Sequence, residues 1–393
     1  VISIFGLGYV GCVSLGCLAK NGHRVIGVDV SSFKVDLINE GKATILEKDI
    51  DVLIKEGHEN GNISATMCAD EAVLNSELSI ICVGTPSSQN GHLNLSYIYN
   101  TAEQIGDALK AKDDFHTVVI RSTVLPGTNQ KFGEIIESKS GKKRGVHFSV
   151  VSNPEFLREG SAVKDYFHPS VTVIGGDHEE AIDKVSSLYS CIPAPIEVTD
   201  IKIAELIKYI NNSFHALKIA FANEVGNICK ALSIDSHKVM ELFCKDTRLN
   251  ISTAYFRPGF AYGGSCLPKD LRGLVTLGHD NYLSTPVLGS IDVSNEHQKK
   301  IAYELISRTE KKNVCFVGLS FKEGTDDLRY SPSVDLAETL LGKGYNVCIY
   351  DENVRLSKLI GANKAFINER LPHLSSLITN DLETAIKEND VVV

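Results

Sequence analysis

One cysteine in the sequence has surroundings suited to nucleophilic chemistry. Cys266 stands in the run Pro258-Gly259-Phe260-Ala261-Tyr262-Gly263-Gly264-Ser265-Cys266-Leu267-Pro268-Lys269-Asp270. A glycine-rich loop exposes backbone N–H groups, small neighbours leave room for a substrate, and Lys269 favours an ionised thiol. Four other cysteines lie in strand or helix patterns that predict buried side chains, namely Cys12, Cys82, Cys315 and Cys348. The sequence therefore singles out Cys266 as a candidate nucleophile.

A glycine fingerprint lies near the start of the chain. Gly6, Gly8 and Gly11 form a Gly-x-Gly-x-x-Gly pattern that directly follows an apolar strand and opens a helix, and Asp29 ends the next strand. The first glycine permits a tight turn, the second lets a pyrophosphate approach the backbone, and the third lets helix and strand pack closely. The helix N-terminus offers free N–H groups to phosphate. Asp29 would bind ribose hydroxyls and repel a 2′-phosphate, which predicts NAD as the cofactor, although Lys34 weakens this preference over NADP.

Two further turns follow predicted strands. They are Gly84-Thr85-Pro86 and the run from Arg121 to Gly127, which contains Thr123. Ligands of open α/β sheets bind at the carboxyl ends of the strands, so Thr85 and Thr123 are candidates to contact cofactor or substrate. Either threonine is also compatible with a purely structural role at a strand end.

A long helical stretch carries polar residues at helical spacing. Glu205, Lys208, Asn212 and His215 are three or four residues apart, which places them on or near one helix face. On spacing alone, a solvated face is the favoured interpretation. The loop that follows another predicted strand, Asn153 to Gly160, adds the carboxylates of Glu155 and Glu159.

The sequence contains no recognisable metal-binding pattern. Its 12 histidines form no His-x-His or His-Glu-x-x-His motif, and its ten cysteines form no Cys-x-x-Cys pair. We therefore expect metal-free catalysis. Ten cysteines in 393 residues are too sparse for a disulfide scaffold, which favours reduced thiols in a cytoplasmic protein.

The elements that must position these residues alternate between strand and helix. Helical patterns such as 12–20 and 97–111 lie between apolar runs, and this alternation predicts an α/β fold with a mostly parallel sheet. The predicted strands are Val1–Phe5, Arg24–Val30, Leu78–Val83, Thr117–Ile120, His147–Val151 and Val171–Ile174. A long helix is predicted from Ile201 to about Leu232, because apolar residues recur there at helical spacing.

A second α/β region follows the helical part. Asn313–Asp351 repeats the order of the first unit, Val1–Val30: strand, glycine turn, helix, and a second strand ending in an acid. One βαβ unit used twice and the general likeness of all βαβ units both explain this. We predict two Rossmann-like domains joined by the long helix: an NAD-binding domain at 1–200, a helical dimerisation region with the cysteine loop at 201–310, and a nucleotide-sugar-binding domain at 311–393. The last run, Asp390-Val391-Val392-Val393, resembles a strand entering a core, so we expect that domain to be truncated.

Composition excludes several classes of protein. Hydrophobic residues make up 43% and charged residues 23%, which is typical of folded soluble proteins. The net charge of −9 argues against a nucleic-acid partner, because phosphate contacts need clustered cations. No apolar run reaches the roughly 18 residues of a membrane helix, so no membrane association is expected.

Taken together, these motifs closely resemble those of the UDP-glucose/GDP-mannose dehydrogenase family. The resemblance spans essentially the whole chain and adds Gly318-Leu319-Ser320-Phe321-Lys322 to the motifs above. It is strongest for the branch that acts on GDP-mannose, at His215, Phe221-Ala222-Asn223-Glu224, Leu249-Asn250 and the run from Tyr255 to Phe260.

The resemblance implies a four-electron oxidation of the GDP-mannose C6 alcohol to the carboxylate of GDP-mannuronate, an alginate precursor, with two NAD⁺ used in turn. Cys266 would attack the intermediate aldehyde, and a second hydride transfer would leave a thioester for water to hydrolyse. Lys208 and Asn212 would stabilise the developing oxyanion. Thr123, Glu155 and Asp270 would hold and activate water, and either carboxylate is a candidate for the general base.

The resemblance also implies binding residues. Those for the cofactor are Tyr9, Val10, Asp29, Lys34, Thr85 and Thr123, with Lys269 and Arg329 nearby. Those for the sugar nucleotide are Glu159, Lys208, Asn212, His215, Asn223, Tyr255, Phe256, Arg257, Pro258, Gly259, Phe260 and Lys322. Similar proteins form intertwined homodimers through the long helix, in which Arg257 reaches the partner's substrate, and higher oligomers remain open.

Three alternatives remain. UDP-glucose 6-dehydrogenase has the same chemistry on a different sugar nucleotide. A single-step β-hydroxyacid dehydrogenase pairs a Rossmann domain with a similar helix, but one hydride transfer needs no thiol. A non-catalytic NAD-binding scaffold would need neither Cys266 nor Lys208.

Overall fold

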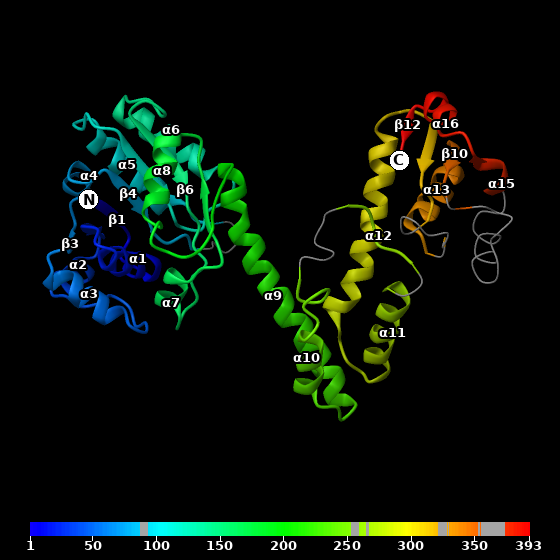
Figure 1. Ribbon diagram of the computed structural model, residues 1–393, viewed down its shortest axis with the longest axis horizontal. Helices are drawn as coiled ribbons and strands as arrows, with labels where there is room; N and C mark the ends of the chain where they lie inside the picture. The colour runs from blue at the N-terminus through cyan, green and yellow to red at the C-terminus, as the bar shows by residue number, and fades with distance from the viewer. Residues whose placement is uncertain are drawn as a thin grey trace. The chain divides into compact units, whose positions relative to one another are not determined.

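An eight-stranded sheet forms the centre of the N-terminal part of the chain (Figure 1). Its strand order is β3-β2-β1-β4-β5-β6-β7-β8. The strands are β1 Ile2–Phe5, β2 Val25–Val28, β3 Ile63–Thr66, β4 Leu78–Ile81, β5 His116–Ile120, β6 Phe148–Ser152, β7 Thr172–Gly175 and β8 Ile196–Thr199. Neighbours pair in parallel except β6 and β7, which pair antiparallel through Ser152 and Gly175. The first six strands have the doubly wound order whose switch point lies between β1 and β4.

The computed structural model describes residues 1–86, 93–252, 259–264, 267–320, 328, 330–352, 354 and 374–393. It divides into two units, Val1–Phe214 and His215–Val393. The boundary falls inside the long helix α9, which runs from Ile201 to Ala231. None of the helices in these described ranges is both long and apolar enough to span a membrane.

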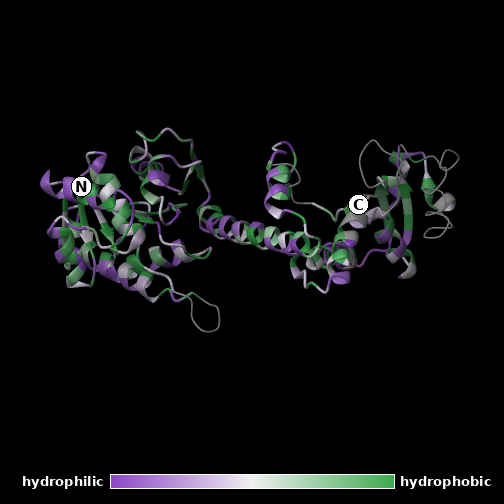
Figure 2. Cartoon of the chain, turned by 90° about the horizontal axis from the view of Figure 1, so that it is seen from below, coloured by the Kyte–Doolittle hydropathy of each residue, from purple (hydrophilic) through white to green (hydrophobic). Residues whose placement is uncertain are grey.

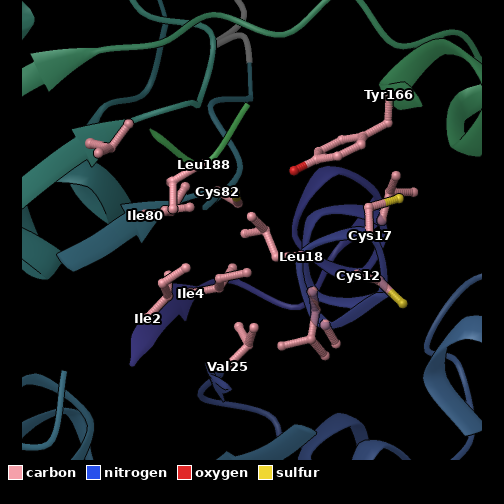
Figure 3. Close-up of a cluster of buried hydrophobic side chains, with 14 of the residues drawn as sticks. Ile2, Ile4, Cys12, Cys17, Leu18, Val25, Ile80, Cys82, Tyr166 and Leu188 are labelled. Carbon is pink, nitrogen blue, oxygen red and sulfur yellow. The ribbon is translucent and has the colours of Figure 1, made fainter. Parts of the chain in front are cut away.

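Helices cover both faces of the first sheet, which is why its strands are continuous apolar runs. One core packs side chains such as Leu18, Ile54 and Tyr166 against the sheet, and Figure 3 shows part of it. The opposite core contains Ile105 and Phe132. The helices of this unit are α1 Tyr9–Lys20, α2 Ser32–Asn39, α3 Ile50–Glu59, α4 Ala69–Leu74, α5 Ser96–Leu109, α6 Thr128–Ser140, α7 Ala162–Phe167 and α8 Glu179–Ser187.

The second unit carries a smaller parallel sheet with the order β11-β10-β9-β12. Its core includes Phe316, Leu340 and Ile349. After α9 the elements are α10 Ser236–Cys244, α11 Leu267–Asp280, α12 Pro286–Ser307, β9 Asn313–Val317, α13 Pro332–Gly342, β10 Asn346–Tyr350, α15 Leu374–Leu377, β11 Ile378–Thr379, α16 Leu382–Glu388 and β12 Val391–Val392.

The α/β class and the predominantly parallel sheet are confirmed. The long helix ends at Ala231, one residue before the predicted limit. The predicted strand Arg24–Val30 is too long, because β2 stops at Val28 and the Asp29 side chain accepts hydrogen bonds from two backbone amides. Hydrophilic and hydrophobic residues are interspersed along α9, as Figure 2 shows.

Three of the four cysteines predicted to be buried are so: Cys12, Cys82 and Cys315. Cys348 is only partly buried. The reason is the two-residue period of a strand, which directs its neighbours Val347 and Ile349 into the core and Cys348 to the opposite face.

Candidate functional site

The turn between β1 and α1 is shaped for a phosphate group. Gly6 has a φ of +93°, and a Cβ on Gly11 would lie 1.7 Å from the Gly6 carbonyl oxygen, so both positions need glycine. A Cβ on Gly8 would meet no atom within 4 Å, which leaves open space beside the turn. Helix α1 starts at Tyr9 with no side-chain cap and no acidic residue in its first turn. Its free N–H groups and the open space at Gly8 fit a dinucleotide pyrophosphate.

Asp29 is held at the end of β2 by the same turn. Its Oδ2 accepts a hydrogen bond from the Leu7 amide at 2.7 Å, and its Oδ1 accepts one from the Ser31 amide at 2.9 Å. The Lys34 ammonium donates to Oδ2 at 3.2 Å. Lys34 is therefore paired with Asp29, and the charge of its ammonium is offset by this carboxylate. Lys34 is then less available to bind a 2′-phosphate. The arrangement fits NAD.

The second unit repeats part of this geometry. The Leu319 amide donates to Oδ2 of Asp351 at 2.7 Å, as Leu7 does to Asp29. Gly318, like Gly6, has a positive φ, of 107°. Among the described residues, the helix that follows β9 is α13, which begins at Pro332.

The two predicted threonine turns are in direct contact at the carboxyl ends of β4 and β5. The Thr85 hydroxyl donates to the Thr123 carbonyl oxygen at 2.9 Å. The Ser122 hydroxyl donates to the Val83 carbonyl oxygen at 2.7 Å, which links the same two turns again. Both threonines are half-buried beside the strand ends.

Lys208 and Glu155 form a buried ion pair. The Lys208 Nζ lies 2.9 Å from Glu155 Oε1, and each side chain is only 9% exposed. The other Glu155 oxygen accepts the Leu157 amide at 2.6 Å, and the ammonium lies 5.7 Å from the centroid of the Phe156 ring. A solvated helix face is therefore wrong for Lys208. The structure brings a fixed cation of α9 to a carboxylate of the loop after β6.

One turn earlier on α9, Glu205 ties the same helix to the Thr123 turn. Its carboxylate accepts hydrogen bonds from the amides of Gly127 at 2.7 Å and Asn129 at 2.8 Å, at the start of α6. The Asn129 side chain donates to it at 2.7 Å. Sequence reasoning placed Glu205 on the helix face but gave it no role. Its position relative to a helix start 76 residues away has no local sequence signal.

The other predicted residues that the structure describes are divided between the two units. Asn212 and Glu159 are exposed in the first unit, and His215 and Asn223 are exposed in the second. Gly259 and Phe260 are exposed, and the Gly259 carbonyl accepts a bond from Gln298 at 2.9 Å. Several predictions fall outside the described residues: Tyr255, Phe256, Arg257, Pro258, Cys266, Lys322 and Arg329, and the side chains of Lys269 and Asp270.

The glycines before Cys266 belong to the second unit. A Cβ on Gly263 would lie 2.2 Å from the Tyr330 carbonyl oxygen, so only glycine fits there. The neighbouring Tyr262 amide donates to Asn295 at 2.9 Å, and Asn295 donates back to the Tyr262 carbonyl at 2.9 Å. Among the described residues, no group of three or more His, Cys, Asp or Glu side chains could hold a metal ion.

Comparison with known protein families gives one consistent match along the chain. The NAD binding domain of the UDP-glucose/GDP-mannose dehydrogenase family matches residues 1–192. The family's central domain matches residues 202–297, and its UDP binding domain matches residues 315–393.

Individual relatives agree with this. GDP-mannose 6-dehydrogenase of Pseudomonas aeruginosa is 50% identical over 393 residues, which cover 100% of this chain and 90% of that protein. UDP-glucose 6-dehydrogenase of Rickettsia bellii is 36% identical over 385 residues, which cover 96% of this chain and 86% of that protein.

Solved structures show the same order of similarity. A ternary complex of GDP-mannose dehydrogenase from Pseudomonas aeruginosa has a TM-score of 0.97 at 50% identity, covering 100% of this chain and 90% of that one. A UDP-glucose dehydrogenase from Pyrobaculum islandicum has a TM-score of 0.61 at 34% identity, covering 100% and 88%.

Proposed function

Because the chain belongs to the UDP-glucose/GDP-mannose dehydrogenase family, we propose that it oxidises C6 of GDP-mannose to the carboxylate of GDP-mannuronate with two NAD⁺. The buried ion pair between Lys208 of α9 and Glu155 of the loop after β6 is the observation that carries this proposal. A hydride transfer near a sugar alcohol needs a fixed cation and a base, and this pair supplies both charges in a site with little water.

The choice of GDP-mannose over UDP-glucose follows from the relatives. Those named for GDP-mannose are about half identical to this chain, whereas those named for UDP-glucose are 36% identical. UDP-glucose is the alternative substrate.

The reaction proceeds in three stages, in which bound NAD⁺ supplies only the hydride acceptor. The C6 alcohol loses a proton and a hydride to give an aldehyde. The Cys266 thiolate then adds to the aldehyde carbon while the aldehyde oxygen takes up a proton. The resulting thiohemiacetal loses that proton and a second hydride, which a second NAD⁺ accepts, and becomes a thioester. Water attacks the thioester, the C–S bond breaks, and the carboxylate leaves with the thiol restored. Four electrons are removed in total.

The roles of the side chains follow from charge and position. The Lys208 ammonium stabilises the oxyanions that form at C6, together with Asn212. Glu155 or Asp270 removes a proton from water, and Thr123 holds that water. Glu155 lies 2.9 Å from the Lys208 ammonium, which holds its carboxylate next to the cation proposed to stabilise the oxyanion. The other residues predicted above to contact NAD and the sugar nucleotide keep these binding roles in the proposed reaction.

We further propose that the protein is a homodimer formed through α9. Large apolar side chains remain exposed at helical spacing on this helix, including Ile203 at 56%, Leu206 at 44% and Ile210 at 53%. A stripe of this kind is normally covered by another surface. We also propose a cytoplasmic location, which the sparse cysteines favour. The proposed use of the product for an acidic polysaccharide such as alginate rests on the family placement.

The decisive experiment is the yield of NADH from a limiting amount of GDP-mannose, with UDP-glucose run beside it and NAD⁺ in excess. Two NADH per GDP-mannose, with little from UDP-glucose, supports the proposal. Two from UDP-glucose instead overturns the substrate, one from either overturns the thioester route, and none favours a scaffold.

A further inference from the structure

Glu47 is a buried carboxylate that lies between the cofactor turn and the loop after β6. It stands in the segment between α2 and α3, is 7% exposed, and is absent from the predicted site. It accepts a hydrogen bond from the Tyr9 hydroxyl. It also accepts bonds from the backbone amides of Gly160 at 2.7 Å and Ala162 at 3.3 Å. A buried carboxylate is costly unless it is hydrogen-bonded in this way.

The three donors come from parts of the chain with different tasks. Tyr9 is the first residue of α1, directly after Gly8 of the phosphate turn. Gly160 follows Glu159, which is proposed to contact the sugar nucleotide, and lies in the same loop as Glu155. Ala162 begins α7. Glu47 therefore links the cofactor side of the site with the loop that carries Glu155 and Glu159.

The segment that carries Glu47 is itself attached to the phosphate turn. The Thr44 hydroxyl donates to the Leu7 carbonyl oxygen at 2.8 Å. Ala43 and Ile45 pack against the core that contains α1. A displacement of the turn when a pyrophosphate binds would thus reach Glu47 by two routes, through Tyr9 and through Thr44.

Hydrogen bonding favours the ionised form of Glu47 in this contact. Burial alone would raise the pKa of the Glu47 carboxyl, but the hydrogen bonds from Tyr9, Gly160, Lys48 and Ala162 outweigh burial and lower it. Burial and the adjacent Glu47 carboxylate raise the pKa of the Tyr9 hydroxyl. Glu47 is therefore an anion and Tyr9 the donor at neutral pH.

We propose that Glu47 is a positioning residue that orders the 155–162 loop when the dinucleotide binds at the turn, and so couples binding of NAD to binding of the sugar nucleotide. The inference rests on the proposed function for the second ligand only. Once Tyr9 is fixed by the cofactor, less entropy is lost in ordering the loop, and the two ligands bind with positive cooperativity. Coupling between ligands typically changes affinity at least about fivefold.

The test uses the full-length protein and two conservative variants. Glu47→Gln keeps the size of the side chain and removes its charge, and Tyr9→Phe removes only the hydroxyl. Tyr166→Phe is the matched control, since its hydroxyl is buried near α1 but has no hydrogen-bond partner among the described residues. Melting temperatures of all three are compared with the wild type.

The first measurement is hydrogen exchange of the peptide spanning 155–165, with and without NADH and with no sugar nucleotide. NADH is expected to slow exchange in the wild type and in Tyr166→Phe, and to have little effect in Glu47→Gln and Tyr9→Phe. Equal protection by NADH in all four proteins overturns the proposal. This arm holds whichever sugar is the substrate.

The second measurement is the Kd of GDP-mannose with and without NADH, repeated with UDP-glucose. We expect NADH to tighten binding at least about fivefold in the wild type and not in Glu47→Gln. A double variant of Glu47 and Tyr9 should behave as either single variant does, because both remove one contact. Unchanged coupling in Glu47→Gln contradicts the proposal, whereas binding of neither sugar contradicts the proposed function and leaves the exchange result to decide on Glu47.

Discussion

The Arg121 guanidinium donates to Oδ1 of Asn153 over 2.7 Å, and each of these buried residues stands two positions before a proposed site residue. Thr123 follows Arg121 and Glu155 follows Asn153. Tyr189 completes the group: Arg121 donates to its hydroxyl at 2.8 Å, and that hydroxyl donates to Asn153 at 2.5 Å. The cluster therefore fixes the ends of β5 and β6 relative to each other.

This cluster lies where the sheet has few backbone hydrogen bonds. Strands β6 and β7 pair only through Ser152 and Gly175, whereas the parallel neighbours pair over four or five residues. The side-chain amide of Asn153 donates to the Val173 carbonyl of β7 at 2.8 Å and so joins the end of β6 to β7. Close to Glu155 in the chain, side-chain hydrogen bonds of this cluster therefore replace the backbone hydrogen bonds between strands.

Removing one hydroxyl tests this cluster. Tyr189→Phe keeps the ring in the core and removes two hydrogen bonds, which should cost about 1 kcal/mol each in stability. We expect kcat to fall severalfold, because Thr123 and Glu155 lose their relative placement, with a smaller change in KM for NAD. Tyr166→Phe is the control and should keep the wild-type kcat. Steady-state kinetics and thermal melting of both variants decide the matter, and equal kcat values would show that the cluster is only structural.

The proposed covalent route makes a sharp demand on Cys266. In Cys266→Ser the first oxidation can proceed, but no thioester forms, so net formation of acid should be lost. NADH binding, followed by nicotinamide fluorescence, should stay intact. Quantifying GDP-mannuronate by chromatography checks this, and full four-electron turnover by the variant would rule out the thioester.

Asp29 should act on the cofactor alone. Loss of a hydrogen bond to a charged group costs about 1.5–3 kcal/mol, so Asp29→Ala should raise KM for NAD about tenfold or more, with a smaller change for GDP-mannose. Asp351→Ala is the matched control, because it removes the same kind of backbone contact, to Leu319, in the second sheet. KM values for both ligands are measured in each variant. If KM for NAD changes equally in the two variants, Asp29 does not bind the ribose.

Much of the fold follows from sequence patterns because its causes are local. Glycines at Gly6 and Gly11, apolar strands and the helical period of α9 all act within a few residues of the chain. In the first sheet, the strands β3 and β8 were not predicted, and their burial is incomplete because they lie at the sheet edges. An edge strand lacks the continuous apolar run on which the prediction depended.

The site was harder to predict because its contacts are distant in sequence. Lys208 and Asn212 were proposed from a resemblance, and only the fold shows that Lys208 is buried against Glu155 while Asn212 is exposed. Glu47 and Glu205 carry no motif at all. Their carboxylates are placed by backbone amides 76 to 115 residues away, and no periodicity in the sequence encodes such contacts.

His116 gives a prediction for stability as a function of pH. It starts β5, and its Nε2 lies 2.8 Å from the Ser79 hydroxyl in a buried cluster of serines. Burial, and then the nearby charge of Lys112, lower its pKa to about 3. A histidine in the unfolded state has a pKa near 6.5. Between about pH 6.5 and 3, His116 is therefore protonated in the unfolded state and neutral in the folded state. Stability is retained above pH 6.5 and declines as the pH falls.

The expected loss is about 1.4 kcal/mol per pH unit, or roughly 2 kcal/mol between pH 6.5 and 5. In His116→Gln this contribution is absent, so its melting temperature should fall less than that of the wild type over the same interval. Melting curves at pH 7, 6 and 5 for both proteins measure the difference. Parallel declines would mean that His116 takes up its proton in the folded protein near the ordinary pKa, and that the serine cluster tolerates the charge.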